Sequence, residues 1–182
     1  MALLADELRA GGHPVVATRE PGGTPVAERV RAVLLDPALA PVPLADALLH
    51  FAARADHVAA VIRPALQRGE NVLCDRFSDS TRAYQGFGQG FDRAAIETLH
   101  GLIGLDPDLT IVLDIRVSTS LGRADGLDRY ERLGTDFLDR VHAGFRAIAA
   151  AEPVRCALIA ADRDRDAIAA DVRAVVRDRL GL

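Results

Sequence analysis

The stretch that decides the fold is Asn71-Val72-Leu73-Cys74-Asp75-Arg76-Phe77-Ser78-Asp79-Ser80-Thr81-Arg82-Ala83-Tyr84-Gln85-Gly86. A short apolar run with a β-branched member leads directly into an acidic and a basic residue, and a hydroxyl-rich segment follows. This order predicts a buried strand over 71–74 and, after its polar carboxyl end, a turn at 84–86. Ligands bind at the carboxyl ends of the strands in open α/β sheets.

Similar apolar runs predict further strands at 13–18, 109–113 and 156–160. Apolar residues at helical spacing predict helices between them, at 1–9, 25–35, 44–67, 93–103, 135–151 and 168–180. The alternation predicts an α/β fold in three layers, with a doubly wound parallel sheet covered by helices on both faces. Polar residues recur at the strand ends, as Arg19-Glu20, Asp75-Arg76 and Asp114.

Two finer expectations concern local structure. Within the helix at 44–67, Leu48, Phe51 and Ala55 are expected to face inward. Beyond the turn at 84–86, the glycines at 86, 88 and 90 are expected to keep the backbone loose.

Length and composition indicate one globular domain over residues 1–182. The net charge of −4 argues against a nucleic-acid polymer as partner, because such binding depends on basic surface. No run of about 18 apolar residues predicts a membrane span. Cys74 and Cys156 lie in apolar runs without metal-ligand spacing, which is typical of reduced thiols in a cytoplasmic protein.

Asp75 and Arg76 are the leading chemical candidates. The planar guanidinium of arginine suits bidentate phosphate contacts, and the aspartate beside it could hold a metal-bound water or orient the arginine. A surface ion pair is the alternative. Ser80, Thr81, Tyr84 and Gln85 are of a kind that can contact a base edge, but such residues are also common in turns.

Arg54 follows His50 and Phe51 by about one helical turn, so a cation and a ring share a face. A solvated surface charge is the alternative for Arg54, and Arg31 is equally ambiguous. The five histidines, at 13, 50, 57, 100 and 142, show no metal-binding spacing and are expected to be structural.

Five motifs in order extend over nearly the whole chain. They are Thr-Arg-Glu-Pro-Gly-Gly-Thr at 18–24, Leu-Leu-His-Phe-Ala-Ala-Arg at 48–54, Asp-Arg-Phe-x-x-Ser-Thr-x-Ala-Tyr-Gln-Gly at 75–86, Pro-Asp-Leu-Thr-Ile-Val-Leu-Asp at 107–114 and Asp-Arg-Tyr-Glu at 128–131. Together they resemble the bacterial thymidylate kinase family. The resemblance implies a nucleoside monophosphate kinase-like fold, transfer of the γ-phosphoryl group of ATP to dTMP with Mg²⁺, and a homodimer.

The resemblance also implies residue roles. Arg76 would hold phosphate between donor and acceptor, and Asp75 could contact the metal ion through water. Arg31 would bind the phosphate of dTMP, and Arg54 a carbonyl of thymine.

Further roles concern the nucleoside. Thr81, Tyr84 and Gln85 would line its site, with Tyr84 crowding a ribose 2′-hydroxyl. Glu20 and Pro21 would flank the deoxyribose.

Three departures from the family pattern stand out. The family begins with a strand and a Gly-x-x-Gly-x-Gly-Lys-[Ser/Thr] loop that cradles the ATP phosphates, and residues 1–182 contain no such motif. A truncated or misplaced start and a non-catalytic relative are the alternative explanations. Without the loop we expect little ATP binding or turnover, and an apolar slot where the first, central strand of the sheet would lie.

The other two departures concern the thymine site and the lid. The ring that would stack on thymine stands at the position of His50, with Phe51 next to it, and either ring could serve. The lid, over about 121–132, is short, and its candidates for contacting ATP are Arg123 and Arg129. Arg123 would also assist transfer, whereas Arg129 could instead serve only in an ion pair.

Overall fold

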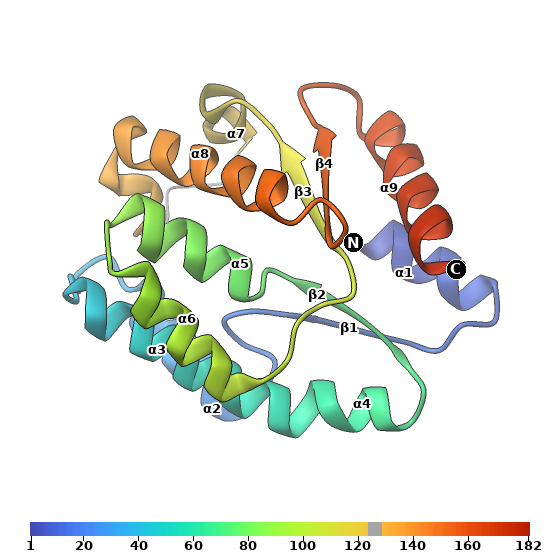
Figure 1. Ribbon diagram of the computed structural model, residues 1–182, viewed down its shortest axis with the longest axis horizontal. Coiled ribbons are helices and arrows are strands. Elements are labelled where there is room, and N and C mark those ends of the chain that lie inside the picture. The colour runs from blue at the N-terminus through green and yellow to red at the C-terminus, as the bar shows by residue number, and fades with distance from the viewer. Residues whose placement is uncertain (124–128) are drawn as a thin grey trace.

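The computed structural model describes residues 1–123 and 129–182, apart from the side chains of 120, 121 and 123 (Figure 1). The described residues form four strands, β1 (Val15–Arg19), β2 (Asn71–Asp75), β3 (Thr110–Asp114) and β4 (Cys156–Ala160). The four strands predicted from the sequence are confirmed, with ends that shift by one or two residues.

The strands form two separate parallel pairs. β1 pairs with β2, with Thr18 opposite Cys74, and β3 pairs with β4, with Val112 opposite Leu158. Among the described strands, β2 and β3 form no ladder with each other, so the sheet is divided between them. Apolar side chains on the strands stay partly open, with Leu113 50% and Leu158 42% exposed. The apolar slot expected at the place of a further central strand stays a prediction.

Helices cover both sides of the strands (Figure 1). α1 (Ala2–Ala10) packs against β1 and α9 (Arg165–Leu180), and α9 also packs against β4. On the other side, α8 (Thr135–Ala151) packs against β3 and β4. The α/β class and the helical layers on both faces are therefore confirmed.

The remaining helical segments complete the side that carries α8. They are α2 (Pro25–Leu35), α3 (Pro43–His57), α4 (Arg63–Gln67), α5 (Ser78–Thr81), α6 (Arg93–Ile103), α7 (Val117–Arg123), the π-helices η1 (Val58–Ile62) and η2 (Arg82–Gly88), and the 3₁₀-helix η3 (Glu131–Leu133). The long helix predicted over 44–67 is formed by α3, η1 and α4 in succession. The side-chain hydroxyl of Thr24 accepts a hydrogen bond from the backbone N–H of Ala27, which caps α2 and fixes the loop after β1.

The expected turn at 84–86 is wrong, because residues 78–88 form α5 and η2 without a break. The glycines at 86 and 88 are buried, and they allow close packing rather than a loose backbone. A Cβ atom on Gly88 would lie 2.6 Å from the ring of Phe137 on α8, so only glycine fits there. Because this requirement comes from a distant helix, local propensity could not reveal it.

The expected inward face of α3 is also partly wrong. Phe51 is buried, but Leu48 is 45% exposed and Ala55 is exposed. Val33 on α2 is 42% exposed as well. These two helices pack on each other and leave apolar side chains on their outer surfaces.

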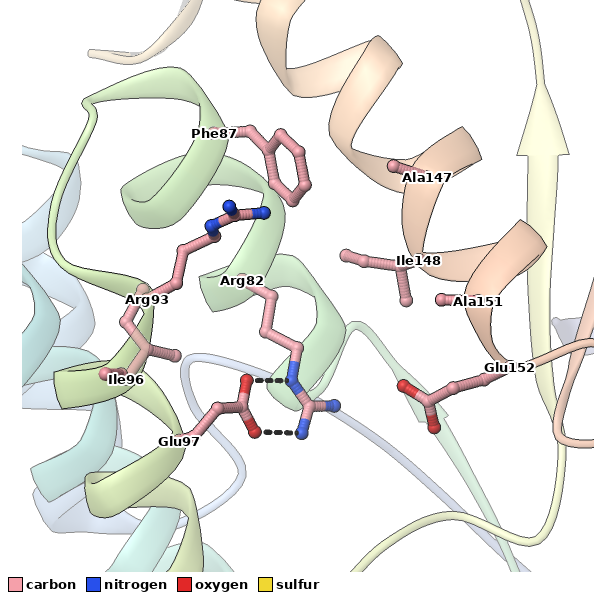
Figure 2. A pocket seen from close by; sticks show the side chains of 10 residues that line it. Arg82, Phe87, Arg93, Ile96, Glu97, Ala147, Ile148, Ala151 and Glu152 are labelled. Carbon is pink, nitrogen blue, oxygen red and sulfur yellow. Dashed lines mark hydrogen bonds and ion pairs between the residues drawn. The ribbon is translucent and has the colours of Figure 1, made fainter.

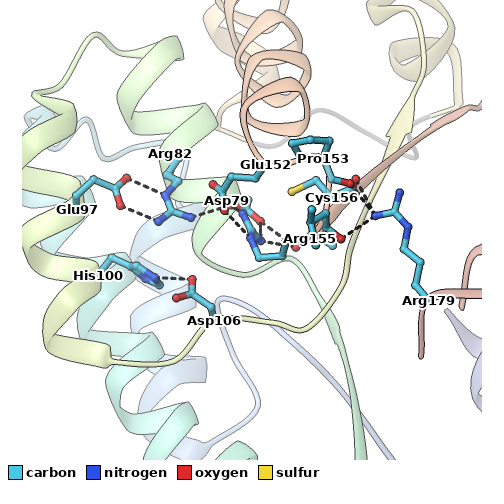
Figure 3. Close-up of polar contacts among 12 residues, drawn as sticks. Asp79, Arg82, Glu97, His100, Asp106, Glu152, Pro153, Arg155, Cys156 and Arg179 are labelled. Atoms are coloured by element: carbon cyan, nitrogen blue, oxygen red, sulfur yellow. Dashed lines mark hydrogen bonds and ion pairs between the residues drawn. The ribbon is translucent and has the colours of Figure 1, made fainter. Parts of the chain in front are cut away.

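A buried charge cluster connects the two halves of the divided sheet (Figure 3). Asp79, on α5 just after β2, is 3% exposed and accepts hydrogen bonds from Arg82, Arg155 and Thr110. Arg155 immediately precedes β4 and Thr110 begins β3, with the shortest Arg155–Asp79 distance at 2.7 Å. Asp79 therefore ties the segment that follows β2 to the starts of β3 and β4.

No helix in the described part of the chain combines the length and apolarity needed to cross a bilayer.

Candidate functional site

The carboxyl ends of β1 and β2 bring the predicted polar residues together. Arg19 stands opposite Asp75 in the parallel register, and the backbone N–H of Glu20 donates to the carbonyl oxygen of Asp75 at 2.9 Å. Glu20 and Arg76 therefore follow neighbouring strand ends, as the sequence predicts. The third strand-end residue, Asp114, lies on the other pair and is bound by His142 and Arg146 of α8.

Arg54 forms the buried centre of this edge. It is 2% exposed, its Nε donates to Glu20 at 2.7 Å, and its Nη2 donates to the hydroxyl of Thr81 at 3.1 Å. Its guanidinium carbon lies 4.9 Å and 5.3 Å from the ring centroids of Phe51 and Phe77. The alternative of a solvated surface charge is therefore wrong.

The remaining nitrogen of Arg54 distinguishes a binding site from a structural ion pair. Nη1 is buried and has no hydrogen-bond partner among the described residues. A buried donor without an acceptor is costly, by about 1–3 kcal/mol, unless another molecule supplies the acceptor. This nitrogen is therefore a candidate donor to a bound ligand.

The loop after β1 is held by His57. Its Nδ1 lies 3.0 Å from Glu20 and its Nε2 lies 2.7 Å from the hydroxyl of Thr18. A Cβ atom on Gly23 would lie 2.6 Å from the His57 ring, so glycine is required where the loop passes the ring. Sequence reasoning treated His57 as structural, and its bonds place Glu20 beside Arg54.

Arg31 and Pro21 are also brought to this loop. Nη1 of Arg31 donates to the carbonyl oxygen of Pro21 at 2.8 Å. This bond places the half-buried Arg31 guanidinium, which belongs to α2, next to the loop that carries Glu20.

Arg76 adopts an unusual backbone conformation for a residue with a side chain, with φ of 67°. Such conformations cost about 1–3 kcal/mol and concentrate at functional sites. Asp75 and Arg76 are both exposed, and the guanidinium carbon of Arg76 lies 5.2 Å from the ring centroid of Tyr84. The strained backbone therefore places the Arg76 cation beside the ring of Tyr84 on η2.

A second buried group, absent from the sequence predictions, centres on Asp46 of α3. Asp46 is fully buried and accepts hydrogen bonds from Gln85 at 3.0 Å, Gln89 at 2.7 Å, Arg129 at 2.5 Å and the hydroxyl of Tyr130 at 3.0 Å. In the sequence, Asp46 resembles an ordinary acidic residue in the first turn of a helix, so nothing local marks it. Its partners place Gln85 and Tyr130 against α3.

The two candidate stacking rings face different surroundings. Phe51 is 5% exposed and lies against Arg54 in the interior. His50 is half-buried, and its Nε2 lies 2.8 Å from the hydroxyl oxygen of Tyr130. Burial, reinforced by the nearby Arg54, lowers the pKa of His50 to about 3, so its ring is neutral. His50 is therefore the more accessible ring at this position.

Comparison with known proteins identifies the family. The family model for thymidylate kinase matches residues 1–172. A thymidylate kinase from Caulobacter vibrioides is 48% identical over 185 residues, which cover 98% of this chain and 89% of the relative. The chain belongs to the thymidylate kinase family.

Other members of the thymidylate kinase family support this assignment. A thymidylate kinase from Trichlorobacter lovleyi is 46% identical over 194 residues, covering 100% of this chain and 92% of the relative. A crystal structure of thymidylate kinase from Ehrlichia chaffeensis superposes with a TM-score of 0.80 at 36% identity, covering 97% of this chain and 89% of that one. The predicted resemblance, the nucleoside monophosphate kinase-like α/β fold and the phosphotransferase class are confirmed.

The segment predicted to be a lid, about 121–132, is only partly described. Residues 124–128 and the side chain of Arg123 lie outside the described part of the chain, so the role predicted for Arg123 stays a prediction. Arg129 forms the buried ion pair with Asp46 and lies over the Tyr130 ring, at 4.4 Å from its centroid. The ion pair that was one of the two alternatives for Arg129 is thus present, and an ATP contact stays a prediction.

One set of three potential metal ligands occurs in the described part of this thymidylate kinase family member. Candidate ligand atoms of Glu20, His57 and Cys74 lie within 4.8 Å of one another. Glu20 and His57 already bond to each other, and the thiol of Cys74 donates to the carbonyl oxygen of Arg76 at 3.0 Å. Burial raises the pKa of the Cys74 thiol, which disfavours the thiolate that metals bind. We interpret Glu20 and His57 as part of the hydrogen-bond network around Arg54, and Cys74 as a thiol bonded to the backbone at the end of β2.

A separate hollow lies between α6 and α8 and contains none of the predicted site residues (Figure 2). Its lining includes Arg82, which bonds Glu97 through two nitrogens, and Arg93, which lies 5.1 Å from the centroid of the Phe87 ring. The predicted site residues Glu20, Asp75 and Arg76 lie instead at the ends of β1 and β2.

Proposed function

We propose that this protein transfers the γ-phosphoryl group of ATP to dTMP, with Mg²⁺, and forms dTDP. The family supports the reaction class, and the retained strand-end residues support dTMP as acceptor. The observation that carries the proposal is the unpaired Nη1 of Arg54, a buried donor beside Thr81 at the ligand edge. ATP and dTMP are cytoplasmic metabolites, so we propose the cytoplasm as the place of action.

The contacts of Arg54 support the proposed acceptor half of the site. Nη1 of Arg54 would donate to a thymine carbonyl, and Thr81, Tyr84 and Gln85 would surround the nucleoside. Tyr84 would exclude a ribose 2′-hydroxyl by crowding it. The guanidinium of Arg54 is already locked by Glu20 and Thr81, so ligand binding would not have to order it.

The sugar and phosphate would lie along the loop after β1. Glu20 and Pro21 would flank the deoxyribose. Arg31, held beside this loop by the Pro21 carbonyl, would bind the phosphate of dTMP. In this proposal the acceptor phosphate would lie on the same side as the strand end that carries Arg76.

Phosphoryl transfer requires mainly positioning and positive charge around the transferred group. Arg76 would supply that charge between the two nucleotides, and Asp75 would contact the magnesium ion through a water molecule. Mg²⁺ neutralises the charge of the ATP phosphates when bound. Arg123 and Arg129 are the proposed lid contacts to ATP.

The ATP side is the incomplete half. All 22 basic side chains are arginine, and residues 1–182 contain no Gly-x-x-Gly-x-Gly-Lys-[Ser/Thr] sequence. We therefore propose that these residues by themselves bind dTMP but transfer phosphate slowly or not at all. This feature favours a second candidate function, that of a non-catalytic nucleotide-binding protein. To distinguish the kinase from the non-catalytic protein, a phosphate-binding strand and loop are joined ahead of residue 1 and dTDP formation is measured. Formation of dTDP supports the kinase.

Replacing Arg54 with alanine is expected to weaken dTMP binding about a hundredfold, because a charged, buried donor is lost. Isothermal titration of dTMP into the wild-type and variant proteins measures the change. Arg177→Ala is the matched control, since this arginine is 72% exposed on α9 and far from the strand ends, and it should leave binding unaltered.

Arg54 also pairs with the buried Glu20, so thermal unfolding is used to check that each variant is folded. The measurement is repeated with the double variant Arg54→Ala and Glu20→Gln, because Arg54→Ala alone leaves a buried carboxylate unpaired. Unchanged dTMP affinity in a folded Arg54→Ala protein would show that Arg54 does not contact the base.

We further propose that two copies associate through α2 and α3. Exposed apolar side chains gather on these packed helices, at Val26, Val33, Leu44 and Leu48, each between 42% and 55% exposed. Such side chains are typical of an interface. Val33→Asp with Leu48→Asp should convert a dimer into a monomer in sedimentation velocity, whereas a wild-type monomer at micromolar concentration would refute this interface.

A further inference from the structure

The carboxylate of Glu28 holds the loop after β1 from the side of α2. Its two oxygens accept hydrogen bonds from Nη2 of Arg19, each at 2.9 Å, and Oε1 also accepts from the backbone N–H of Gly23 at 2.9 Å. A Cβ atom on Gly22 would lie 2.6 Å from Oε1 of Glu28, so the loop backbone passes directly against the carboxylate. Glu28 is therefore built into the loop at 19–24.

A second arginine lies within reach of the same carboxylate. Arg31 follows Glu28 by three positions on α2, a spacing at which a carboxylate and a guanidinium can pair. The hydrogen bond from the Gly23 N–H lowers the pKa of Glu28, and the charges of Arg19 and Arg31 lower it further against the opposing effect of desolvation. Glu28 is therefore charged at neutral pH and has two possible cationic partners.

The structure shows which partner Glu28 takes. Its ion pair is with Arg19, whereas Nη1 of Arg31 donates to the carbonyl oxygen of Pro21 at 2.8 Å. Within the described part of the chain, Nε and Nη2 of Arg31 have no hydrogen-bond acceptor. These two nitrogens are therefore left for a ligand.

The choice of partner matters for an anionic ligand. A guanidinium that is paired with a carboxylate has fewer donors and less net positive charge to offer to a phosphate group. An unpaired carboxylate beside the phosphate would also repel it. The pairing of Glu28 with Arg19 avoids both effects, because it neutralises the carboxylate and keeps it away from Arg31.

We propose that Arg19 is a positioning residue for the phosphate of dTMP. It holds the Glu28 carboxylate on the loop and prevents it from pairing with Arg31, whose guanidinium then binds the phosphate. Arg19 acts through Glu28 and not by contact with the nucleotide. The inference rests on the proposed function, because it specifies how the proposed phosphate contact of Arg31 is kept available.

The test is calorimetric titration of dTMP, and of thymidine, which lacks the phosphate, into the wild-type chain and Arg19→Ala. In Arg19→Ala, dTMP affinity should fall about threefold, the scale of an exposed ion pair, while thymidine affinity stays the same. The double variant Arg19→Ala with Glu28→Gln should regain the wild-type affinity for dTMP. Its glutamine oxygen can still accept from Gly23 but has no charge to pair with Arg31.

Arg29→Ala is the matched control. It removes a positive charge from an exposed position next to Glu28 on α2, and it should leave both affinities unchanged. A merely structural role for Arg19 would loosen the loop, weaken thymidine as much as dTMP, and leave the double variant no better than Arg19→Ala. That result, or an unchanged dTMP affinity in Arg19→Ala, would overturn the proposal.

The outcomes separate this inference from the proposed function. If the wild-type chain does not bind dTMP, the proposed function itself fails. The change of partner is also visible without a nucleotide, because the ¹⁵N resonance of Nε of Arg31 should shift in Arg19→Ala and return in the double variant. An Arg31 resonance that is the same in all three proteins would overturn only the role assigned to Arg19.

Discussion

Replacing Arg76 with alanine is expected to lower the rate of dTDP formation about a thousandfold, while dTMP binding changes little. Arginines that stabilise the charge of a transferred phosphoryl group contribute about 10³–10⁵ in turnover. Arg76 lies at the end of β2 with a strained φ of 67°, at the strand edge where Glu20 and Arg54 also lie. The measurement is a steady-state assay of dTDP in a chain that carries a phosphate-binding strand and loop ahead of residue 1.

A control variant distinguishes an effect of the position of Arg76 from a general effect of removing one positive charge. Arg177→Ala removes the same charge from an exposed site on α9 and should keep full turnover. Arg76→Lys should recover only part of the activity, because an ammonium group lacks the bidentate geometry of guanidinium. Equal turnover of Arg76→Ala and the parent protein would exclude Arg76 from the transfer step.

Replacing Asp79 with alanine is expected to lower the free energy of unfolding by about 3–5 kcal/mol, the cost of removing one partner from a buried charge cluster. Asp79 accepts from both Arg82 and Arg155, whose side chains are only 14% and 13% exposed. The change would leave two arginines without this carboxylate. It would also remove the hydrogen bonds that link α5 to the starts of β3 and β4 (Figure 3). Urea unfolding measures the loss.

Glu97→Ala is the matched control for Asp79→Ala. Glu97 also binds Arg82, but its side chain is 52% exposed, so its loss should cost no more than about 1 kcal/mol. Equal losses in the two variants would show that Asp79 does not hold the two halves together.

The contribution of Asp79 also has a defined pH dependence. Burial alone would raise its pKa, but the hydrogen bonds and charges of Arg155 and Arg82 outweigh burial and lower it. A carboxyl group with a lowered folded-state pKa stabilises the fold above its unfolded pKa of about 3.9 and loses that effect as the pH falls through the folded value. The stability difference between wild-type and Asp79→Asn should therefore shrink only below about pH 4.

Much of the fold and the outline of the site could be predicted from the sequence. Apolar runs that end in polar residues located the strands, because buried parallel strands carry little else. Parallel pairing alone predicts that Glu20 and Asp75 lie close together, because the carboxyl ends of β1 and β2 are at the same edge of the sheet. The helical bounds of α8 were also predictable, because its apolar period is regular.

The missed features depend on contacts between distant residues. Gly88 is required by the packing of Phe137 on α8, whereas the sequence alone predicts a loose backbone there. Asp46 accepts hydrogen bonds from Gln85 and Gln89 and from Arg129 and Tyr130 of the predicted lid, 39 to 84 positions away. The exposure of Leu48 also depends on which face of α3 the neighbouring α2 covers. No local pattern contains this information.

The most direct test of the central claim is the affinity of the chain for deoxynucleoside monophosphates. Calorimetric titration with dTMP, dUMP and dCMP at one ionic strength provides it, because the residues of the proposed acceptor site all lie in the described part of the chain. We predict that dTMP binds at least tenfold more tightly than dCMP. Equal affinities, or a preference for dCMP, would contradict the assignment of the β1–β2 strand ends as a thymidylate site.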